Sequence, residues 1–251
     1  MKSLIVNDLC IEVTRRCNMK CSHCMRGDAQ NINLNIDVIN KLFNNKEFEI
    51  KKINRLSITG GEPTLNAVAI LKIIREILNK KIKINSFVMV INGSIYNIDL
   101  VKGLNLLYKY YLDNEDKNQF ELICSRDQFH IYQKADVLSK YNELPYFINN
   151  EIIINNNQIL CLGRAYKNKI GNISTYYIYK TFFYKNIENN YPIIHSFSNG
   201  KFSLEKLYLS SKGLYGFQIM DATYDMVDEL CIYNQDKMEE FLSQSKVKRR
   251  N

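Results

Sequence analysis

Three of the seven cysteines in this chain lie within one short segment, as Cys17, Cys21 and Cys24. The other four are scattered: Cys10, Cys124, Cys161 and Cys231. With seven cysteines in 251 residues, the probability that any one has partners at both +4 and +7 is roughly 0.5%. Thiolates bind zinc and iron–sulfur clusters, so the spacing predicts a soft-metal site.

The spacing alone does not decide between a zinc site and an iron–sulfur cluster. A structural zinc site needs four closed ligands, but His23 lies too close to Cys21 and Cys24 to serve easily as the fourth, and no second Cys-x-x-Cys follows. Three thiolates on a [4Fe–4S] cluster leave one iron without a protein ligand. That iron can bind a small molecule through nitrogen and oxygen donors, while zinc stays the alternative.

A second segment that could take part in binding or catalysis is Gly60-Gly61-Glu62-Pro63. It follows the apolar stretch Ile53–Ile58 and precedes a helical pattern over Ala67–Leu78, so a strand, a loop and a helix are expected. Paired glycines permit close approach of the backbone to a ligand, Glu62 adds a carboxylate, and Pro63 fixes φ. An ordinary turn between strand and helix explains the same residues.

Together, Cys17-x3-Cys21-x2-Cys24 after a first strand and Gly60-Gly61-Glu62-Pro63 after a second resemble the radical S-adenosylmethionine (radical SAM) superfamily. The resemblance implies that the cysteines bind a [4Fe–4S] cluster whose fourth iron chelates SAM. It also implies that the Gly-Gly-Glu-Pro loop contacts the SAM ammonium group, that His23 lies against the cofactor, and that a donor such as flavodoxin or ferredoxin supplies electrons.

The elements that must position these residues alternate along the chain. Apolar runs predict strands at Leu9–Thr14, Ile53–Thr59, Phe87–Ile91, Phe120–Ser125 and Ile152–Leu162, and helical patterns cover Ile36–Phe43, Ala67–Leu78, Leu100–Leu112 and Tyr132–Tyr141. This alternation predicts an α/β protein with right-handed crossovers, a partial (β/α)6 TIM-like barrel. A radical SAM core over 1–170 is expected to carry a small β-rich C-terminal extension over 171–251.

In such a barrel, ligands bind at the carboxyl ends of the strands. Asn92 follows the third predicted strand, Ser125 and Asp127 follow the fourth, and Arg164 follows the fifth. We therefore expect Ser125 and Asp127 to hold ribose hydroxyls, although Asp127 could instead cap a helix, and Arg164 to clamp a carboxylate. His130 is a less favoured candidate for a substrate-contacting base.

The C-terminal extension departs from the family pattern. It contains a hairpin signal over Leu207–Ile219 with a glycine-containing turn and a closing helix over Gln235–Lys246. Met220 and Asp221 stand where a cysteine of an auxiliary cluster would be expected, and Cys231 alone cannot hold one. We therefore expect a single cluster, with Tyr215 and Tyr224 selecting the substrate and taking no part in SAM cleavage.

Composition limits the cellular setting. The formal net charge is +8, but half of it comes from the last six residues, and no basic and aromatic stripe predicts nucleic-acid binding. The N-terminus lacks the apolar segment of a signal peptide, and no run reaches the roughly 18 apolar residues of a membrane helix. These features predict a cytoplasmic protein that does not associate with membranes.

The function expected from the resemblance is reductive cleavage of SAM to a 5′-deoxyadenosyl radical, which abstracts hydrogen from a substrate. A tyrosine-rich extension with a strand edge favours a peptide or protein substrate. The alternatives are a glycyl-radical activase, a radical SAM enzyme acting on a small molecule or nucleoside, and a non-catalytic iron–sulfur or zinc protein. Met25-Arg26-Gly27-Asp28 stands where activases commonly carry Asn-Pro, which disfavours the activase.

Overall fold

The computed structural model describes residues 1–131, 133–175, 177, 193–197, 199–215, 223–229, 233–234 and 246–249. The strands are β1 (Lys2–Thr14), β2 (Phe48–Gly60), β3 (Lys83–Ile91), β4 (Gln119–Cys124), β5 (Phe147–Ile148), β6 (Ile193–Ser196), β7 (Phe202–Leu209), β8 (Gly213–Tyr215), β9 (Tyr233–Asn234) and β10 (Lys246–Arg249). The α-helices are α1 (Ile36–Phe43), α2 (Ala67–Asn79), α3 (Ile98–Leu112), α4 (Ala135–Tyr141), α5 (Gly163–Lys167) and α7 (Tyr224–Glu229), and 3-10 turns cover Pro63–Asn66 and Asn156–Gln158.

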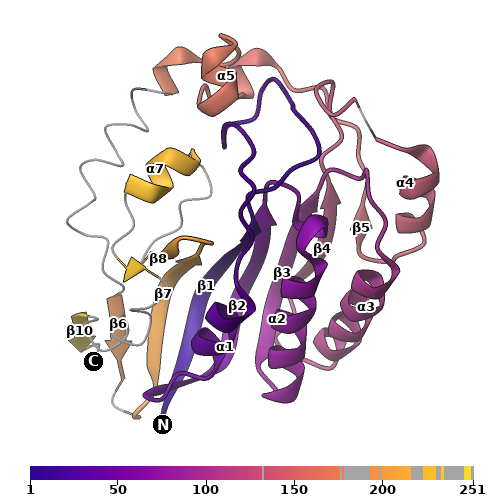
Figure 1. Cartoon of the computed structure of the whole chain (residues 1–251). Coiled ribbons are helices and arrows are strands. Elements are labelled where there is room, and N and C mark those ends of the chain that lie inside the picture. Colours follow the sequence, from indigo (N-terminus) through magenta and orange to yellow (C-terminus); the bar gives the residue numbers. More distant parts are fainter. Residues whose placement is uncertain are drawn as a thin grey trace.

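The candidate site lies at one edge of the parallel part of the sheet. Strands β1 to β5 lie side by side in sequence order, all parallel, and helical crossovers connect β1 to β2, β2 to β3, β3 to β4 and β4 to β5. The α/β class with parallel strands is therefore confirmed, while closure into a six-stranded barrel stays a prediction. Because the strands are parallel, their carboxyl ends share one edge of the sheet, and the cysteine loop lies over that edge (Figure 1).

Apolar side chains explain why the helices lie where they do. Helices α1, α2 and α3 cover one face of the sheet (Figure 1), and each turns a fully or nearly buried aliphatic row toward it, for example Ile39, Ile70 and Leu104. Asn35 accepts a hydrogen bond from the backbone N of Asp37 and so caps the start of α1. The predicted bounds of α1 match the structure.

The C-terminal part extends the same sheet. β7 pairs with β1 in parallel, on the side of β1 opposite β2, and the outer neighbour of β7 is the antiparallel β6. β8 returns antiparallel to β7, so the predicted hairpin is confirmed over its described residues, with Ser210–Lys212 as the turn. The domain boundary near residue 170 stays a prediction.

Two sequence-based expectations need correction or fall outside the description. The stretch Ile152–Leu162 is not a strand, because Asn155 and Gln158 cap a 3-10 turn in its middle. The strand that follows β4 in the sheet is instead the short β5. Lys246, the expected last residue of the closing helix, belongs to β10. The rest of that helix, together with Met220, Asp221 and Cys231, lies outside the described residues.

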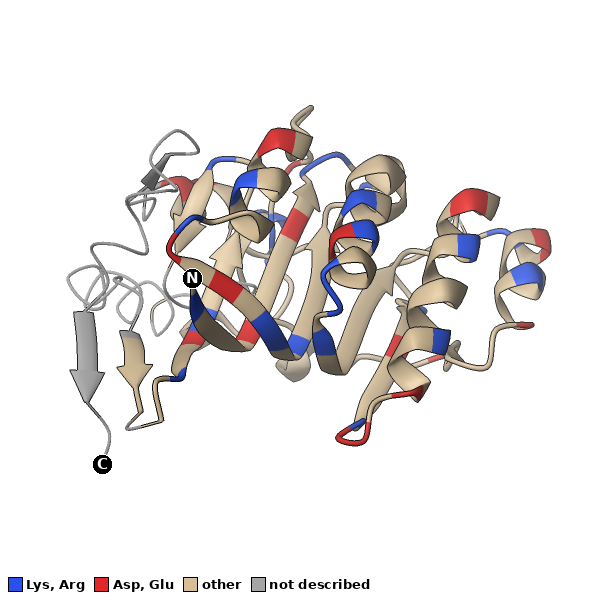
Figure 2. Ribbon diagram, turned by 90° about the horizontal axis from the view of Figure 1, so that it is seen from below, with Lys and Arg blue, Asp and Glu red and all other residues tan. Residues whose placement is uncertain are grey.

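Basic and acidic side chains are mixed on one face of the molecule (Figure 2). Figure 2 shows Lys and Arg interspersed with Asp and Glu on the helices and strands of the face in view, so no field of one sign dominates there. Among the described helices, none combines the length and the apolar character needed to cross a membrane.

Candidate functional site

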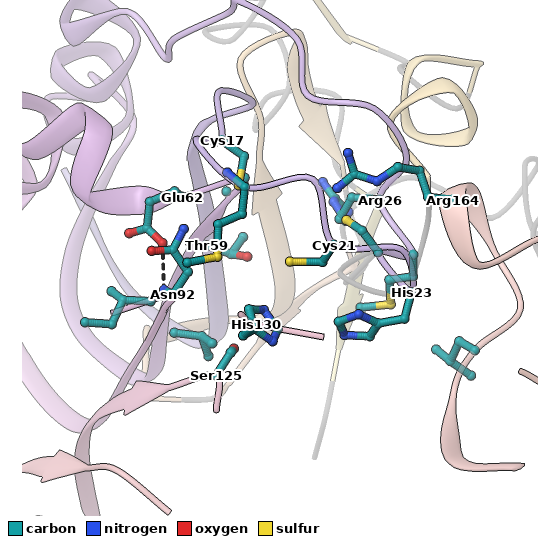
Figure 3. A pocket seen from close by; sticks show the side chains of 18 of the residues that line it. Cys17, Cys21, His23, Arg26, Thr59, Glu62, Asn92, Ser125, His130 and Arg164 are labelled. Carbon is teal, nitrogen blue, oxygen red and sulfur yellow. Dashed lines mark hydrogen bonds between the residues drawn. The ribbon is translucent and has the colours of Figure 1, made fainter. Parts of the chain in front are cut away.

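A cavity of about 410 Å³ lies at the carboxyl ends of β1 to β4 (Figure 3). Of the residues expected to bind the metal or cofactor, it is lined by Cys17, Cys21, Cys24, His23, Gly60, Gly61, Glu62, Asn92, Ser125 and Arg164. The predicted convergence of several loops on one mouth is therefore observed. Pro63 and Asp127 are not among the lining residues.

The cysteine loop follows β1 directly. Cys17, Cys21 and Cys24 are all half-buried, and the backbone N of Cys24 donates to Cys21 O at 3.2 Å. The loop is tied back to its own start, because Arg15 N donates to Ile32 O and Gln30 N donates to Arg15 O. The segment between the first and third cysteines is thereby held over the end of the strand.

Burial disfavours a bare thiolate at Cys17 and at Cys21. Burial, together with the neighbouring cysteines, raises the pKa of Cys21 to about 11, although Arg164 opposes the shift. Burial also raises the pKa of Cys17. Thiolates here therefore need a cation to stabilise them, and iron or zinc supplies one.

The two glycines at the end of β2 pack closely against the backbone at the start of the cysteine loop. A Cβ on Gly61 would lie 2.4 Å from Arg16 O, and one on Gly60 would lie 2.5 Å from Thr14 O. Gly61 N donates to Thr14 O and Glu62 N donates to Arg16 O. The paired glycines thus allow close approach of the backbone to the start of the cysteine loop, and this packing accounts for both of them without a ligand.

Glu62 connects the ends of β2 and β3. Its buried carboxylate accepts hydrogen bonds from the backbone N and the hydroxyl of Thr64 and, at 2.7 Å, from the backbone N of Asn92 (Figure 3). Burial raises the pKa of Glu62, although these hydrogen bonds oppose the shift. The carboxylate lines the cavity, as expected for a residue that meets a cationic group, while its role toward SAM stays a prediction.

Asn92 is joined to the cysteine loop. Its Nδ2 donates to Asn18 Oδ1 at 2.9 Å, and its Oδ1 accepts from the hydroxyl of Ser94. Asn18 in turn donates to that same hydroxyl. Sequence reasoning missed Asn18 and Ser94, whose polar side chains flank a cysteine and a strand end and so carry a weak signal.

The start of α5 forms the opposite wall. Gly163 has a φ of +53°, and a Cβ there would lie 2.5 Å from both Gly27 N and Met25 O. Arg164 N donates to Cys24 O at 2.9 Å, so this wall is bonded to the third cysteine. The Arg164 side chain lines the cavity, and its buried Nε makes no hydrogen bond in the described part of the chain. This cation is positioned to meet an anionic group, as expected.

The ring of His23 contacts two other aromatic rings beside the cavity. Its ring stacks on Phe129 with centroids 4.4 Å apart and meets the ring of His130 edge-on at 5.3 Å. Asp127 faces both histidines, and its Oδ1 accepts from the backbone N of Phe129. Burial lowers the pKa of His23, although Asp127 opposes the shift. Asp127 thus contacts two imidazoles beside the cavity, whereas a ribose contact was expected.

Ser125 lines the cavity at the end of β4, where its backbone N donates to Ile91 O. Gln133, which sequence reasoning missed, donates from Nε2 to Ser125 O at 2.6 Å and to Asn92 O at 3.1 Å. This amide joins the ends of β3 and β4. A glutamine three residues after a histidine has no sequence signal for such a role.

A buried ionic network beneath the loop was also missed. Glu12, fully buried in β1, pairs with both Arg15 and Arg26 and accepts a hydrogen bond from the hydroxyl of Tyr208 at 2.7 Å. Arg15 also forms a two-point contact with Asp228 of α7, at 2.9 and 2.8 Å. A glutamate within an apolar strand, followed closely by arginines, was the signal available.

The donor set fits a three-thiolate cluster with an attached amino acid. Three half-buried thiols share the cavity with an arginine whose Nε is unbonded and with a buried carboxylate. An arginine suits a carboxylate group, and a glutamate suits an ammonium group. No fourth cysteine lines the described cavity, so a closed four-cysteine zinc site does not form there.

Comparisons with known proteins agree with this donor set. Residues 10–113 match the family described as a 4Fe-4S single cluster domain, a range that includes all three cysteines. A GTP 3′,8-cyclase from Chlorobaculum tepidum is 28% identical over 159 residues, which cover 59% of this chain and 46% of the cyclase. The chain therefore spans less than half the length of this curated relative.

Proposed function

We propose that this chain is a radical SAM enzyme that cleaves SAM at a single [4Fe–4S] cluster, a proposal that the match to a 4Fe-4S single cluster domain and the similarity to a GTP 3′,8-cyclase support. The bound groups would supply an electron and then a 5′-deoxyadenosyl radical, which takes a hydrogen atom from the substrate. The observation that supports this best is the shared cavity of Cys17, Cys21, Cys24, Glu62 and Arg164.

The chain's own residues have separate tasks in this proposal. The three cysteines bind the cluster, Glu62 accepts hydrogen bonds from the SAM ammonium group, and Arg164 binds the carboxylate. Glu62 suits its task because three hydrogen bonds from Thr64 and Asn92 already fix its orientation. Ser125 and His23 contribute further polar surface to the same cavity.

A peptide or protein is the first candidate substrate, from the tyrosine-rich extension. The described Tyr208, Tyr215 and Tyr224 are buried, however, so peptide docking would have to use other residues of that extension. A purine nucleotide is the second candidate, because the matched relative is a GTP 3′,8-cyclase. We propose cytoplasmic location and a flavodoxin or ferredoxin as electron donor.

The test is anaerobic reconstitution followed by reduction in the presence of SAM. Wild-type protein is expected to hold about four irons and four sulfides and to release 5′-deoxyadenosine. Cys17→Ala, Cys21→Ala and Cys24→Ala should each lose the cluster and the cleavage together, whereas Cys10→Ala and Cys231→Ala should keep both. A normal cluster in the first three variants contradicts the proposal.

Substrate class is tested in the same assay. Candidate peptides encoded nearby and GTP are added separately, and the rate of 5′-deoxyadenosine formation and the mass of each added compound are followed. A peptide substrate predicts faster SAM cleavage and a modified peptide, with GTP unchanged. Modified GTP with unchanged peptides assigns the second candidate.

A further inference from the structure

Two histidines and an aspartate form a group at the edge of the cavity that the cluster and SAM do not require. His130 Nδ1 lies 2.9 Å from Asp127 Oδ1, and His23 Nε2 lies 3.8 Å from Asp127 Oδ2. One ligand atom from each of the three residues lies within 4.8 Å of the other two. All three side chains are largely buried, at 17%, 6% and 13% exposure for His23, Asp127 and His130.

Local structure fixes these side chains from two directions. Asp127 and His130 belong to one turn after β4, in which His130 N donates to Asp127 O and Asp127 Oδ1 accepts from Phe129 N. His23 comes from the cysteine loop, and the ring of Phe129 stacks on it. A turn and a loop far apart in sequence therefore bring their nitrogen and oxygen donors together.

The spacing suits a single metal ion. Zinc lies about 2.0–2.2 Å from histidine nitrogen and carboxylate oxygen, so two donors in a tetrahedral site are roughly 3.4 Å apart. The two donor distances of 2.9 and 3.8 Å lie on either side of this value. The two distances end on different oxygens of Asp127, and one ligand atom from each of the three residues already lies within 4.8 Å of the other two, so a single ion would draw the carboxylate and the two imidazoles closer together.

Hydrogen bonding alone accounts poorly for the group. Nδ1 of both histidines is buried and makes no hydrogen bond within the residues that the structure describes, although Asp127 Oδ1 lies near His130 Nδ1. A buried imidazole nitrogen without a partner is costly. His130 Nδ1 lies 2.9 Å from Asp127 Oδ1 without forming a hydrogen bond, and a metal ion bonded to both atoms would satisfy them together.

We propose that His23, Asp127 and His130 bind one divalent first-row transition-metal ion at the side of the cluster cavity. Two histidines and one carboxylate are a recurrent ligand set for zinc and non-haem iron. Both imidazoles line the cavity whereas Asp127 does not, so the open coordination positions of the ion would face the cavity. A substrate oxygen or nitrogen, or a water molecule, would occupy them.

The site is compatible with the cluster and with SAM. A metal binds His23 in the plane of its ring, at a nitrogen lone pair, whereas contact with a cofactor would use a face of the ring, and Phe129 stacks on one of the two faces. The positive charge of Arg164 is close enough to act on His23 and opposes the binding of a metal cation there, whereas the negative charge of Asp127 favours that binding. Imidazole and carboxylate donors also differ in softness from the three thiols, which separates the two kinds of metal.

Zinc binding to the anaerobically reconstituted full chain tests the proposal without SAM, so its outcome is independent of the proposed function. Wild-type protein should retain about one zinc per chain after gel filtration, in addition to its cluster iron. Asp127→Asn and His130→Gln should each bind zinc at least about 10-fold more weakly, while keeping iron and sulfide at wild-type levels. Retained iron also shows that a variant is folded.

Two matched controls separate this site from other zinc ligands. Asp136→Asn changes an exposed aspartate of α4, and His195→Gln changes the histidine that pairs with Glu205 at 2.9 Å. Both should bind zinc as the wild type does. The proposal is overturned if Asp127→Asn or His130→Gln keeps its cluster and binds zinc as tightly as the wild type does. It is also overturned if the wild-type protein retains no zinc.

Discussion

The ring of Tyr224 in α7 lies 4.7 Å from the guanidinium carbon of Arg26, which follows the third cysteine by two residues. The same ring lies 4.8 Å from the guanidinium carbon of Arg15, and Tyr224 N donates to Arg26 O at 3.1 Å. Tyr224 therefore holds both ends of the cysteine loop. These contacts show that Tyr224 positions the loop, while its expected role in substrate selection stays a prediction.

Replacing Tyr224 by leucine should loosen the cysteine loop. The change removes the aromatic face that contacts two cations, which we expect to lower the free energy of unfolding by about 2 kcal/mol. Urea denaturation and iron content after reconstitution measure the effect, and cluster occupancy should fall with stability. Tyr224→Phe keeps the ring and should stay near wild type, so equal losses in both variants would show that the ring face is unimportant.

Glu12→Gln should be more damaging. The Glu12 carboxylate contacts two buried guanidinium groups, at 2.8 Å from Arg15 Nε and directly at Arg26, so a neutral amide leaves buried positive charge poorly compensated. Loss of one partner in a buried ion network typically costs about 3–5 kcal/mol. The unfolding midpoint in urea measures this. Glu49→Gln, which affects a surface pair with Lys51, is the control and should change it little. A small effect of Glu12→Gln would contradict the assigned network.

The parts of the fold set by local sequence were predictable. Apolar periodicity and an asparagine cap define α1, and the carboxyl ends of β1 to β4 lie within about one residue of the predicted ends. The first two strands begin at Lys2 and Phe48, well before the predicted starts. Ile152–Leu162 was misread because its apolar ends hide a central run of Asn and Gln that prefers a turn. In the sequence, an isoleucine that will be exposed looks the same as one that will be buried, so the apolar ends of this run suggested a buried strand.

Pairings between distant segments could not be predicted. β7 lies beside β1, and Asp228 reaches Arg15 across 213 positions, and neither relation has a periodic signature. Motif spacing identified the three cysteines and the Gly-Gly-Glu-Pro loop as a site, and the structure brings them to one cavity. The reason for the glycines was not visible in sequence, because their crowding comes from the backbone of another loop.

Gly163→Ala should displace the cysteine loop. Its positive φ strains any other residue, and the new Cβ would also meet backbone atoms of Met25 and Gly27 at 2.5 Å. Gly200→Ala is a matched control, since Gly200 has a φ of +74° but open space around the position of its Cβ. We expect both variants to lose about 1 kcal/mol of stability from backbone strain. Only Gly163→Ala should also lose cluster iron, and equal iron contents would contradict the assigned contact.

Glu62→Ala should weaken SAM binding more than it changes cluster content. A charge-assisted hydrogen bond from the ammonium group is worth about 1.5–3 kcal/mol, so the dissociation constant of SAM should rise by roughly 10- to 150-fold. Equilibrium binding to the reconstituted protein and iron analysis of the same sample measure the two quantities. Unchanged SAM affinity in a folded, cluster-loaded variant would reduce Glu62 to a structural link between β2 and Asn92.

The pH dependence of SAM binding gives an independent check on Glu62. Burial raises the pKa of this carboxyl, so as pH falls through that raised value the group takes up a proton and no longer accepts from an ammonium group. SAM affinity should therefore decline on the acid side, at a higher pH than an exposed glutamate would give. The hydroxyl of Thr64 donates to Glu62 at 2.6 Å and stabilises its charged form. Thr64→Val should move the midpoint of the decline to higher pH, and a midpoint that stays in place would show that another group governs it.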